Sequence, residues 1–372
     1  MENAENILKQ LREPERIRML SERLKTLGST KRMRIMEVCG THTMAIHRMG
    51  LLSLLPPSIT LLSGPGCPVC VTPGSYLDTA FAMARSYDIT LATFGDMMRV
   101  PGAQGTLAGL RSEGYPVEVV YSPLAALELA RRSPERRVVF LAVGFETTAP
   151  VVAATVMQAH RENIGNFSIL CAHKLVIPAL EVLISDPATA IDGFILPGHV
   201  SIILGAEPYR FIPEQHKRAC VITGFEPYDI ILGLFMLTGQ IESGRFSVEI
   251  QYTRSVSPGG NERARSLMFE VFSPADTDWR GFGPIPKSGL ALREEYRNFD
   301  AASLYPVETE PSPEPAGCSC GEVLRGVFSP RDCPLFATMC TPENPVGPCM
   351  VSSEGTCAAF YRYSRTGTTR GA

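Results

Sequence analysis

The feature that most constrains how this chain folds is a regular alternation of short apolar segments with segments compatible with helices. Eight segments rich in β-branched or apolar residues follow one another, and most neighbours start 25 to 30 residues apart. Their residue ranges are 34–38, 59–63, 89–93, 117–121, 138–143, 167–171, 193–196 and 220–223. Strands that alternate with helices at such intervals are typical of βαβ units, in which the strands run parallel. The pattern therefore predicts the α/β fold class with parallel sheets.

The eight predicted strands fall into two groups of four, which predicts two similar α/β domains facing one another across a cleft. Their expected boundaries are residues 31–122 and 123–228. Residues 1–30 have apolar side chains at near-helical spacing, which predicts an amphipathic helix, broken near Pro14, that packs on a third domain. The alternation ends after residue 228. Residues 229–372 are therefore expected to form this small third domain, with a proline-rich linker at 306–315.

Composition narrows the class of protein. The chain has 372 residues, an apolar fraction of 45% and a formal net charge of −3, which is typical of a folded globular protein and gives no basic surface for nucleic acid. The first 28 residues lack the apolar core of a secretory signal, and the longest strongly apolar run, 230–237, is too short to span a bilayer. These features predict a cytoplasmic protein that binds neither nucleic acid nor membranes.

Glycine, proline and titratable residues gather directly after the predicted strands. The segments that carry them include Cys39-Gly-Thr-His42, Gly64-Pro-Gly-Cys67-Pro-Val-Cys70, Phe94-Gly-Asp96, Gly144-Phe-Glu146 and Pro197-Gly-His199. Because open α/β sheets bind ligands at the carboxyl ends of their strands, these loops predict a functional site. Cys39 is a candidate nucleophile or metal ligand. Asp96, Glu146 and His199 are candidate proton shuttles or ligand-orienting groups, and the alternative for each is a turn-capping carboxylate or a buried histidine.

Six of the eleven cysteines lie within the last 55 residues. Clustered cysteines in a reducing compartment more often bind metal or do redox chemistry than form structural disulfides. Cys318, Cys333, Cys340 and Cys357 have the spacing C-x14-C-x6-C-x16-C, which suits a [4Fe–4S] cluster. Zinc is the alternative, but the paired short C-x2–4-C knuckles typical of zinc sites are absent. Cys320 is the alternative to Cys318, and Cys349 is an alternative to an inner ligand.

Cys67-Pro-Val-Cys70 is a C-x-x-C motif at a predicted strand-to-helix turn. A helix amino end lowers the pKa of a thiol there and favours reversible disulfide formation. The motif therefore predicts a redox-active pair, and its alternative role is half of a metal site.

Several of these segments together resemble the HypD family of hydrogenase maturation proteins, and the resemblance covers nearly the whole chain. The matching segments are Cys39-Gly-Thr-His-Thr43, Gly64-Pro-Gly-Cys-Pro-Val-Cys70, Thr93-Phe-Gly-Asp-Met-Met-Arg-Val-Pro-Gly102, Gly144-Phe-Glu-Thr-Thr-Ala-Pro150, Leu196-Pro-Gly-His-Val-Ser201 and Cys349-Met-Val-Ser-Ser-Glu-Gly-Thr-Cys357. The resemblance implies a scaffold for assembling the Fe(CN)2CO group of [NiFe]-hydrogenases. It also implies two α/β domains and a third domain that holds a [4Fe–4S] cluster.

The resemblance further implies the partners and the roles of individual residues. HypC is the expected chaperone partner, HypE the expected source of cyanide, and the hydrogenase large subunit an indirect partner through HypC. By this analogy Cys39 binds the iron of the transient Fe(CN)2CO group, together with the amino-terminal cysteine of HypC. Cys67 and Cys70 form a thiol/disulfide couple linked to the cluster. The residues expected to line the cleft are His42, Asp96, Glu146, His199 and Glu354.

Two other functions fit parts of the sequence. A free-standing thiol/disulfide reductase with an iron–sulfur relay uses Cys67, Cys70 and the carboxyl-terminal cysteines, but leaves the Cys39 motif without a role. An α/β ligand-binding module with structural zinc accounts for the strand pattern, but not for the density of reactive residues in the loops. The preferred hypothesis is an assembly scaffold with redox activity.

Overall fold

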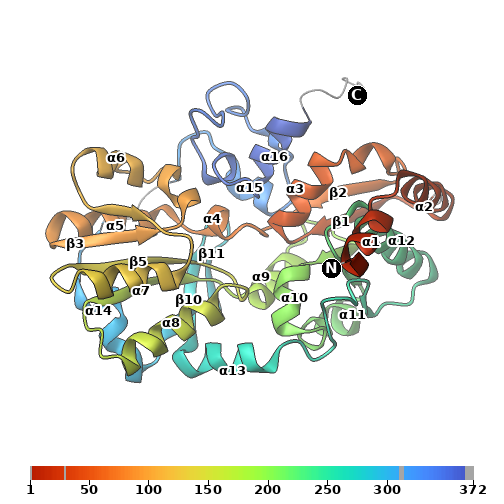
Figure 1. Cartoon of the computed structure of the whole chain (residues 1–372). Coiled ribbons are helices and arrows are strands. Elements are labelled where there is room, and N and C mark those ends of the chain that lie inside the picture. The colour runs from red at the N-terminus through yellow and green to blue at the C-terminus, as the bar shows by residue number, and fades with distance from the viewer. Residues whose placement is uncertain (1, 29–30, 310–313, 365–372) are drawn as a thin grey trace.

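Two parallel sheets lie side by side in the computed structural model, which describes residues 2–28, 31–309 and 314–364 (Figure 1). Sheet A has the strand order β2-β1-β7-β8-β9, and sheet B has the order β4-β3-β5-β6. The strands of sheet A are β1 (Met33–Glu37), β2 (Ile59–Ser63), β7 (Gly193–Leu196), β8 (Ala219–Ile222) and β9 (Val248–Ile250). Those of sheet B are β3 (Ile89–Thr93), β4 (Val117–Val119), β5 (Arg137–Gly144) and β6 (Phe167–His173). All pairs within both sheets are parallel, so the α/β class is confirmed.

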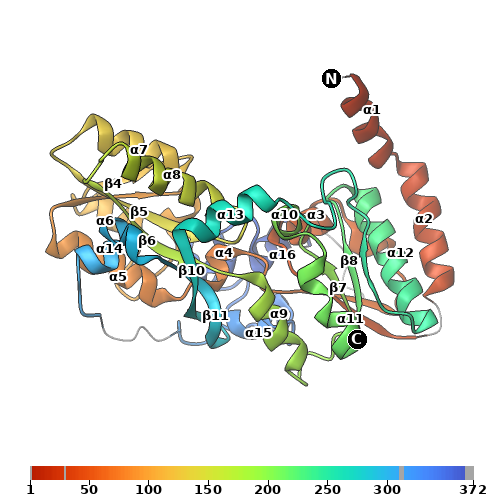
Figure 2. The same ribbon diagram turned by 90° about the horizontal axis from the view of Figure 1, so that it is seen from below.

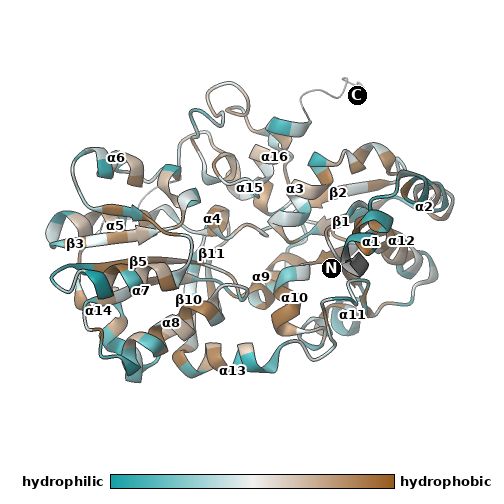
Figure 3. Cartoon of the chain, in the orientation of Figure 1, coloured by the Kyte–Doolittle hydropathy of each residue, from teal (hydrophilic) through white to brown (hydrophobic). Residues whose placement is uncertain are grey.

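Helices cover both faces of each sheet, which is why the central strands are continuous apolar runs. The helices of the sheet A layer are α2 (Pro14–Leu27), α3 (Gly40–Arg48), α9 (Val176–Ser185), α10 (Gly198–Leu204), α11 (Phe211–His216) and α12 (Pro227–Ser243). Those of the sheet B layer are α5 (Gly74–Ser86), α6 (Leu107–Ser112), α7 (Pro123–Arg132), α8 (Ala149–Arg161) and α13 (Glu262–Val271). Figure 3 shows hydrophobic colouring in β5, α9 and α10 and hydrophilic colouring at the periphery.

The prediction that consecutive strands form the two domains is wrong. The first two strands, β1 and β2, pair with the late strands of sheet A, whereas the next four form sheet B. Strand β1 pairs with β7, so that Ile35 lies opposite Gly193 across 158 residues of chain. The expected boundaries 31–122 and 123–228 therefore divide both sheets. Periodicity identifies strands but carries no information about which distant strand each one pairs with.

The expected third domain, residues 229–372, is also divided in the structure. Helix α12 and strand β9 complete sheet A, and α13 packs on α8. The antiparallel hairpin of β10 (Phe272–Trp279) and β11 (Gly283–Leu292) packs against β6 and α9, and the short α14 (Ala301–Leu304) follows it. What remains is a segment from residue 314 to residue 364, which we call the cysteine-rich segment. Residues 310–313 of the expected linker, and 365–372, lie outside the described residues.

The amino-terminal region and the cysteine-rich segment flank sheet A. The predicted break near Pro14 is confirmed, because it separates α1 (Glu2–Leu11) from α2. Helix α2 packs along α12, which belongs to the sheet A layer rather than to a separate domain (Figure 2). The cysteine-rich segment, with α15 (Cys320–Leu324) and α16 (Thr356–Tyr363), packs on α3 and on the single-turn α4 (Pro68–Val71). In the part of the chain that the structure describes, every helix is too short or too polar to cross a bilayer.

Candidate functional site

A cleft of about 540 Å³ lies where the carboxyl ends of strands from both sheets meet. Its walls come from the loops after β1, β2, β3, β4, β5 and β7, and from residues of the cysteine-rich segment. Four of the residues predicted for the site line it: Cys39, Asp96, His199 and Glu354. Two of them come from sheet A loops, one from a sheet B loop and one from the cysteine-rich segment, so three distant parts of the chain build one site.

Cys39 stands at the amino end of α3, where backbone bonds hold it. Its carbonyl accepts the N–H groups of His42 (2.8 Å) and Thr43 (3.1 Å), and its own N–H donates to Oε2 of Glu37 (3.1 Å). A Cβ atom on Gly66 would lie 2.3 Å from the nitrogen of Cys39, so only glycine allows the loop after β2 to approach this closely. The loop after β1 is therefore rigidly placed before any ligand binds.

Burial keeps the thiol of Cys39 protonated. The residue is 7% exposed, and burial raises its pKa to about 12, with the charge of Glu354 adding to the effect. A thiol in such a site becomes a thiolate when a metal ion replaces its proton.

Polar side chains from three segments meet beside Cys39. The Thr41 hydroxyl donates to Oε1 of Glu354 (2.6 Å) and lies 3.5 Å from Nδ1 of His199. Burial raises the pKa of Glu354, and burial lowers the pKa of His199. The hydroxyl of Ser352 lies 3.5 Å from Oδ2 of Asp96. The cysteine-rich segment thus delivers a carboxyl group to the sheet A loops and a hydroxyl group to a sheet B loop.

His42 and Glu146 do not line the cleft, contrary to expectation. His42 is fully buried, with Nε2 3.0 Å from the carbonyl oxygen of Gly224, and burial lowers its pKa to about 4. It packs α3 on the loop after β8. Oε1 of the buried Glu146 accepts the N–H of Val176 (2.9 Å) at the start of α9, and burial raises its pKa to about 7. Position in the sequence placed both residues at strand ends but could not give the direction of their side chains.

Cys67 and Cys70 lie between the cleft and the cysteine-rich segment. They flank the single turn α4, where Sγ of Cys67 accepts the N–H of Cys70 (3.3 Å), and both are buried. The helix is thus shorter than the one predicted. Burial raises the pKa of Cys70, which also interacts with the thiol of Cys349. Sγ of Cys349 in turn lies 2.8 Å from Sγ of Cys320. Four thiols therefore follow one another from α4 into the cysteine-rich segment.

The six carboxyl-terminal cysteines line one small cavity: Cys318, Cys320, Cys333, Cys340, Cys349 and Cys357. Burial raises the pKa of Cys357, and the neighbouring thiols of Cys340, Cys318 and Cys333 raise it further. Within residues 2–28, 31–309 and 314–364, no group of three or more cysteine, histidine or acidic side chains already has the geometry of a metal site. The donor set is thiol only, which suits soft metals and iron–sulfur clusters rather than magnesium or calcium.

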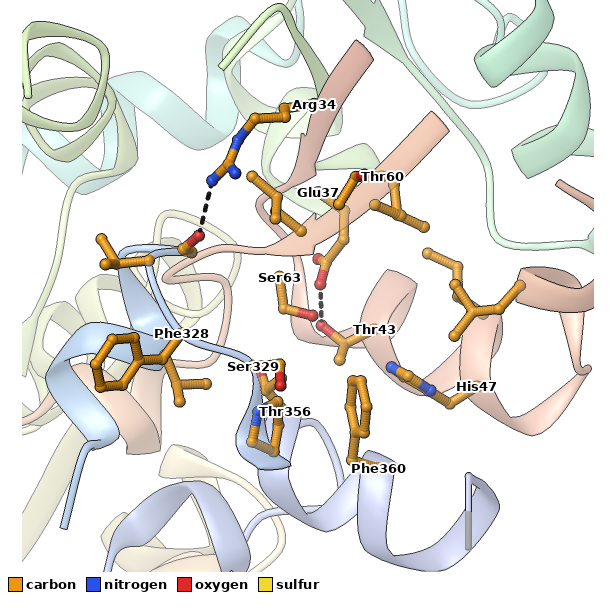
Figure 4. Close-up of a pocket in the computed structure, with 18 residues that line it drawn as sticks. Arg34, Glu37, Thr43, His47, Thr60, Ser63, Phe328, Ser329, Thr356 and Phe360 are labelled. Atoms are coloured by element: carbon orange, nitrogen blue, oxygen red, sulfur yellow. Dashed lines mark hydrogen bonds between the residues drawn. The ribbon is translucent and has the colours of Figure 1, made fainter. Parts of the chain in front are cut away.

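A second cavity of about 170 Å³ lies behind Cys39, between β2, α3 and the cysteine-rich segment (Figure 4). Figure 4 shows the carboxyl group of Glu37 pointing to Thr43, whose hydroxyl donates to Oε1 at 2.5 Å. Burial raises the pKa of Glu37 to about 8. Because Glu37 also accepts the N–H of Cys39, it holds the cysteine loop to α3. The sequence analysis missed this residue, although an acidic side chain at the end of an apolar strand was a visible signal.

Fold and site together define a thiol-rich α/β protein in which two parallel sheets enclose a cleft with a cysteine at a strand end. The family model HypD, described as "Hydrogenase formation hypA family", matches residues 15–364. The hydrogenase maturation factor HypD of Azotobacter vinelandii is 45% identical over 356 residues, 94% of each chain. The proteins of the same name from Cupriavidus necator and Escherichia coli are 44% identical over 343 residues (90% of each chain) and 43% over 360 (95% of this chain, 96% of that protein). The chain belongs to the HypD family.

Proposed function

We propose that this chain is a hydrogenase maturation factor that serves as scaffold and redox partner for assembling the Fe(CN)2CO group. In this proposal HypC binds over the cleft and HypE delivers cyanide, while the iron under assembly is cargo held by Cys39. The observation that carries the proposal is the position of Cys39, a buried thiol at the cleft wall with Glu354 beside it and the Cys67–Cys70 turn behind it.

The chemistry of the cleft supports this role. A thiolate is a soft ligand that suits low-spin iron with cyanide and carbonyl ligands. When iron binds, the S–H bond of Cys39 breaks and an S–Fe bond forms. We assign the released proton to Glu354, whose carboxyl group has a raised pKa and is therefore a good acceptor near neutral pH. A partner that closes over the cleft excludes water from the group being built.

The six-cysteine cavity supports a [4Fe–4S] cluster as resident cofactor. The proposed ligands are Cys318, Cys333, Cys340 and Cys357, because the first three are the thiols that act on Cys357. Cys320 is instead engaged with Cys349, which leaves those two thiols to connect the cavity with Cys70. When bound, the cluster supplies single electrons. The chain's own contribution is a row of buried thiols that releases two electrons and two protons for each disulfide formed.

The decisive test is infrared spectroscopy of the complex co-purified with HypC. Cys39→Ala is expected to abolish the nitrile and carbonyl bands, because the iron loses its anchor, while about four iron and four labile sulfides per chain remain, as one cubane cluster requires. Bands that survive in the variant would show that Cys39 is not the anchor. Stoichiometric zinc in the wild type would refute the cluster.

The row of four thiols also favours a second candidate, a free-standing iron–sulfur-linked thiol/disulfide reductase. Such an enzyme would lose disulfide reduction in Cys67→Ser and would be indifferent to Cys39→Ala. A scaffold responds in the opposite order in the infrared assay, so the same two variants separate the two functions.

A further inference from the structure

Arg280 is a buried arginine at the turn of the β10–β11 hairpin, and it is bound to the end of α4. The residue is 3% exposed. Its peptide N–H donates to the carbonyl oxygen of Val71 (2.8 Å), and Nε donates to the carbonyl oxygen of Thr72 (3.1 Å). These two carbonyls directly follow Cys70. The guanidinium group is therefore fixed relative to the Cys67–Cys70 turn.

The same turn touches the cysteine-rich segment. A Cβ atom on Gly281, whose φ is +80°, would lie 2.4 Å from Cα of Gly321, so the two backbones are in direct contact next to Cys320. Figure 2 shows this end of the hairpin beside α15. The positive charge of Arg280 also acts on the thiol of Cys318. There it lowers the pKa, against the hydrogen bond with Cys320 and the burial that raise it.

The charge of Arg280 is only partly balanced by the groups around it. Nη1 pairs with Oε2 of Glu314 at 2.5 Å, but the side chain of Glu314 is 52% exposed and its charge is weakened by water. Nη2 is buried without a hydrogen-bond partner among the described residues. A guanidinium group cannot release its proton, so a buried one needs a nearby anion. The candidate anions on its inner side are the thiolates that form when the cysteine cavity binds metal.

We propose that Arg280 is the counter-charge of the Cys318 side of the proposed [4Fe–4S] cluster and sets its reduction potential. This inference rests on the cluster of the proposed function. Four thiolates make a cluster anionic, and reduction adds one more negative charge. A fixed positive charge in a dry site stabilises the reduced form more than the oxidised form. Arg280 therefore makes the cluster easier to reduce, and its backbone bonds place that effect next to the redox thiols of α4.

The test is an EPR-monitored redox titration of the full chain purified anaerobically, with single-charge variants. Arg280→Gln is expected to make reduction about tenfold less favourable, a 59 mV fall in potential for a one-electron couple. Glu314→Gln removes the opposing charge and is expected to shift the potential upward. Arg331→Gln is the matched control, because Arg331 is an exposed arginine of the same segment that donates to the carbonyl oxygen of Ser364. Its potential is expected to equal that of the wild type.

The opposite signs distinguish an electrostatic role from a structural one, because loss of packing would shift both variants in one direction. Arg280→Lys keeps the charge and is expected to retain most of the potential. Equal potentials in Arg280→Gln and the wild type would overturn the inference. So would a shift of the same sign in Glu314→Gln.

The failure of the cluster itself is detected separately. A wild type without iron and sulfide would refute the proposed cofactor, and the placement of Arg280 is then tested on the metal-free chain. Iodoacetamide is expected to alkylate Cys318 at least threefold more slowly in Arg280→Gln than in the wild type or in Arg331→Gln, as followed by mass spectrometry. Equal rates would overturn the inference.

Discussion

At the scale of single residues, burial decides the protonation of the groups around the cleft. It raises the pKa of Cys39 to about 12 and that of Glu146 to about 7, and it lowers the pKa of His42 to about 4. Each shift favours the neutral form, because the interior disfavours charge. The site is therefore nearly uncharged at neutral pH, and a bound metal group would supply most of its charge.

Glu146 makes the stability of the chain depend on pH. Its ordinary pKa of 4.5 applies to the unfolded chain, and the folded value is about 7. Between these values the folded chain keeps a proton that the unfolded chain has lost, so this contribution to the free energy of unfolding falls as pH rises. Glu146→Gln cannot lose that proton. The urea midpoint of the variant is therefore expected to gain on the wild type between pH 5 and pH 8.

Circular dichroism at several pH values measures these midpoints. Glu135→Gln is the control, since the side chain of Glu135 is 73% exposed. Its midpoint is expected to run parallel to that of the wild type. Parallel curves for Glu146→Gln as well would contradict the buried, neutral state assigned to this carboxyl group.

At the scale of elements, the close approach of two loops places Cys39. The loops after β1 and β2 touch at Gly66, and Glu37 of β1 holds the start of α3. Neither loop could keep its position without the other. The anchor of the site is thus a property of two adjacent strand ends and not of the Cys39 segment alone.

Gly66→Ala is expected to disrupt this junction. The added methyl group collides with backbone atoms of Cys39, which cannot rotate away, so a loss on the order of 3 kcal/mol in the free energy of unfolding is expected. Urea unfolding measures it. Gly95→Ala is the matched control, because Gly95 also lines the cleft but its new Cβ atom would meet only Val119, at 3.8 Å. Equal losses in the two variants would show that the loops adjust freely.

At the scale of the whole molecule, the chain crosses between the sheets before either is complete. It leaves sheet A after β2, builds all of sheet B, and returns for β7, β8 and β9. The cysteine-rich segment then closes over the junction, where Glu354 and Ser352 reach the loops of both sheets. The cleft therefore exists only when the full chain has folded.

This topology predicts how fragments behave. Residues 31–122 contain β1 and β2 without β7, and β3 and β4 without β5, so two apolar strand edges would be left open. This fragment is expected to show no cooperative thermal transition by circular dichroism. Residues 74–188 contain all four strands of sheet B with α5 to α9, and they are expected to retain one. A cooperative transition in the first fragment would contradict the observed strand order.

Much of the local structure could be predicted, because it depends on neighbouring residues. Apolar runs and turn residues located all eight strands expected between residues 34 and 223, and Pro14 located the break between α1 and α2. The cysteine spacing selected four thiols that the fold brings around Cys357. The missed features are contacts between distant segments, such as the engagement of Glu37 with α3 and of Arg280 with α4.

The sequence by itself determined the α/β class, the strand ends that carry reactive residues and the membership of the HypD family. Only the tertiary structure decided which strands share a sheet, that His42 and Glu146 turn away from the cleft, and that Cys70, Cys349 and Cys320 form a row. The physical reason is that periodicity and turn chemistry act over a few residues. Strand pairing and side-chain direction instead depend on packing between segments more than a hundred residues apart.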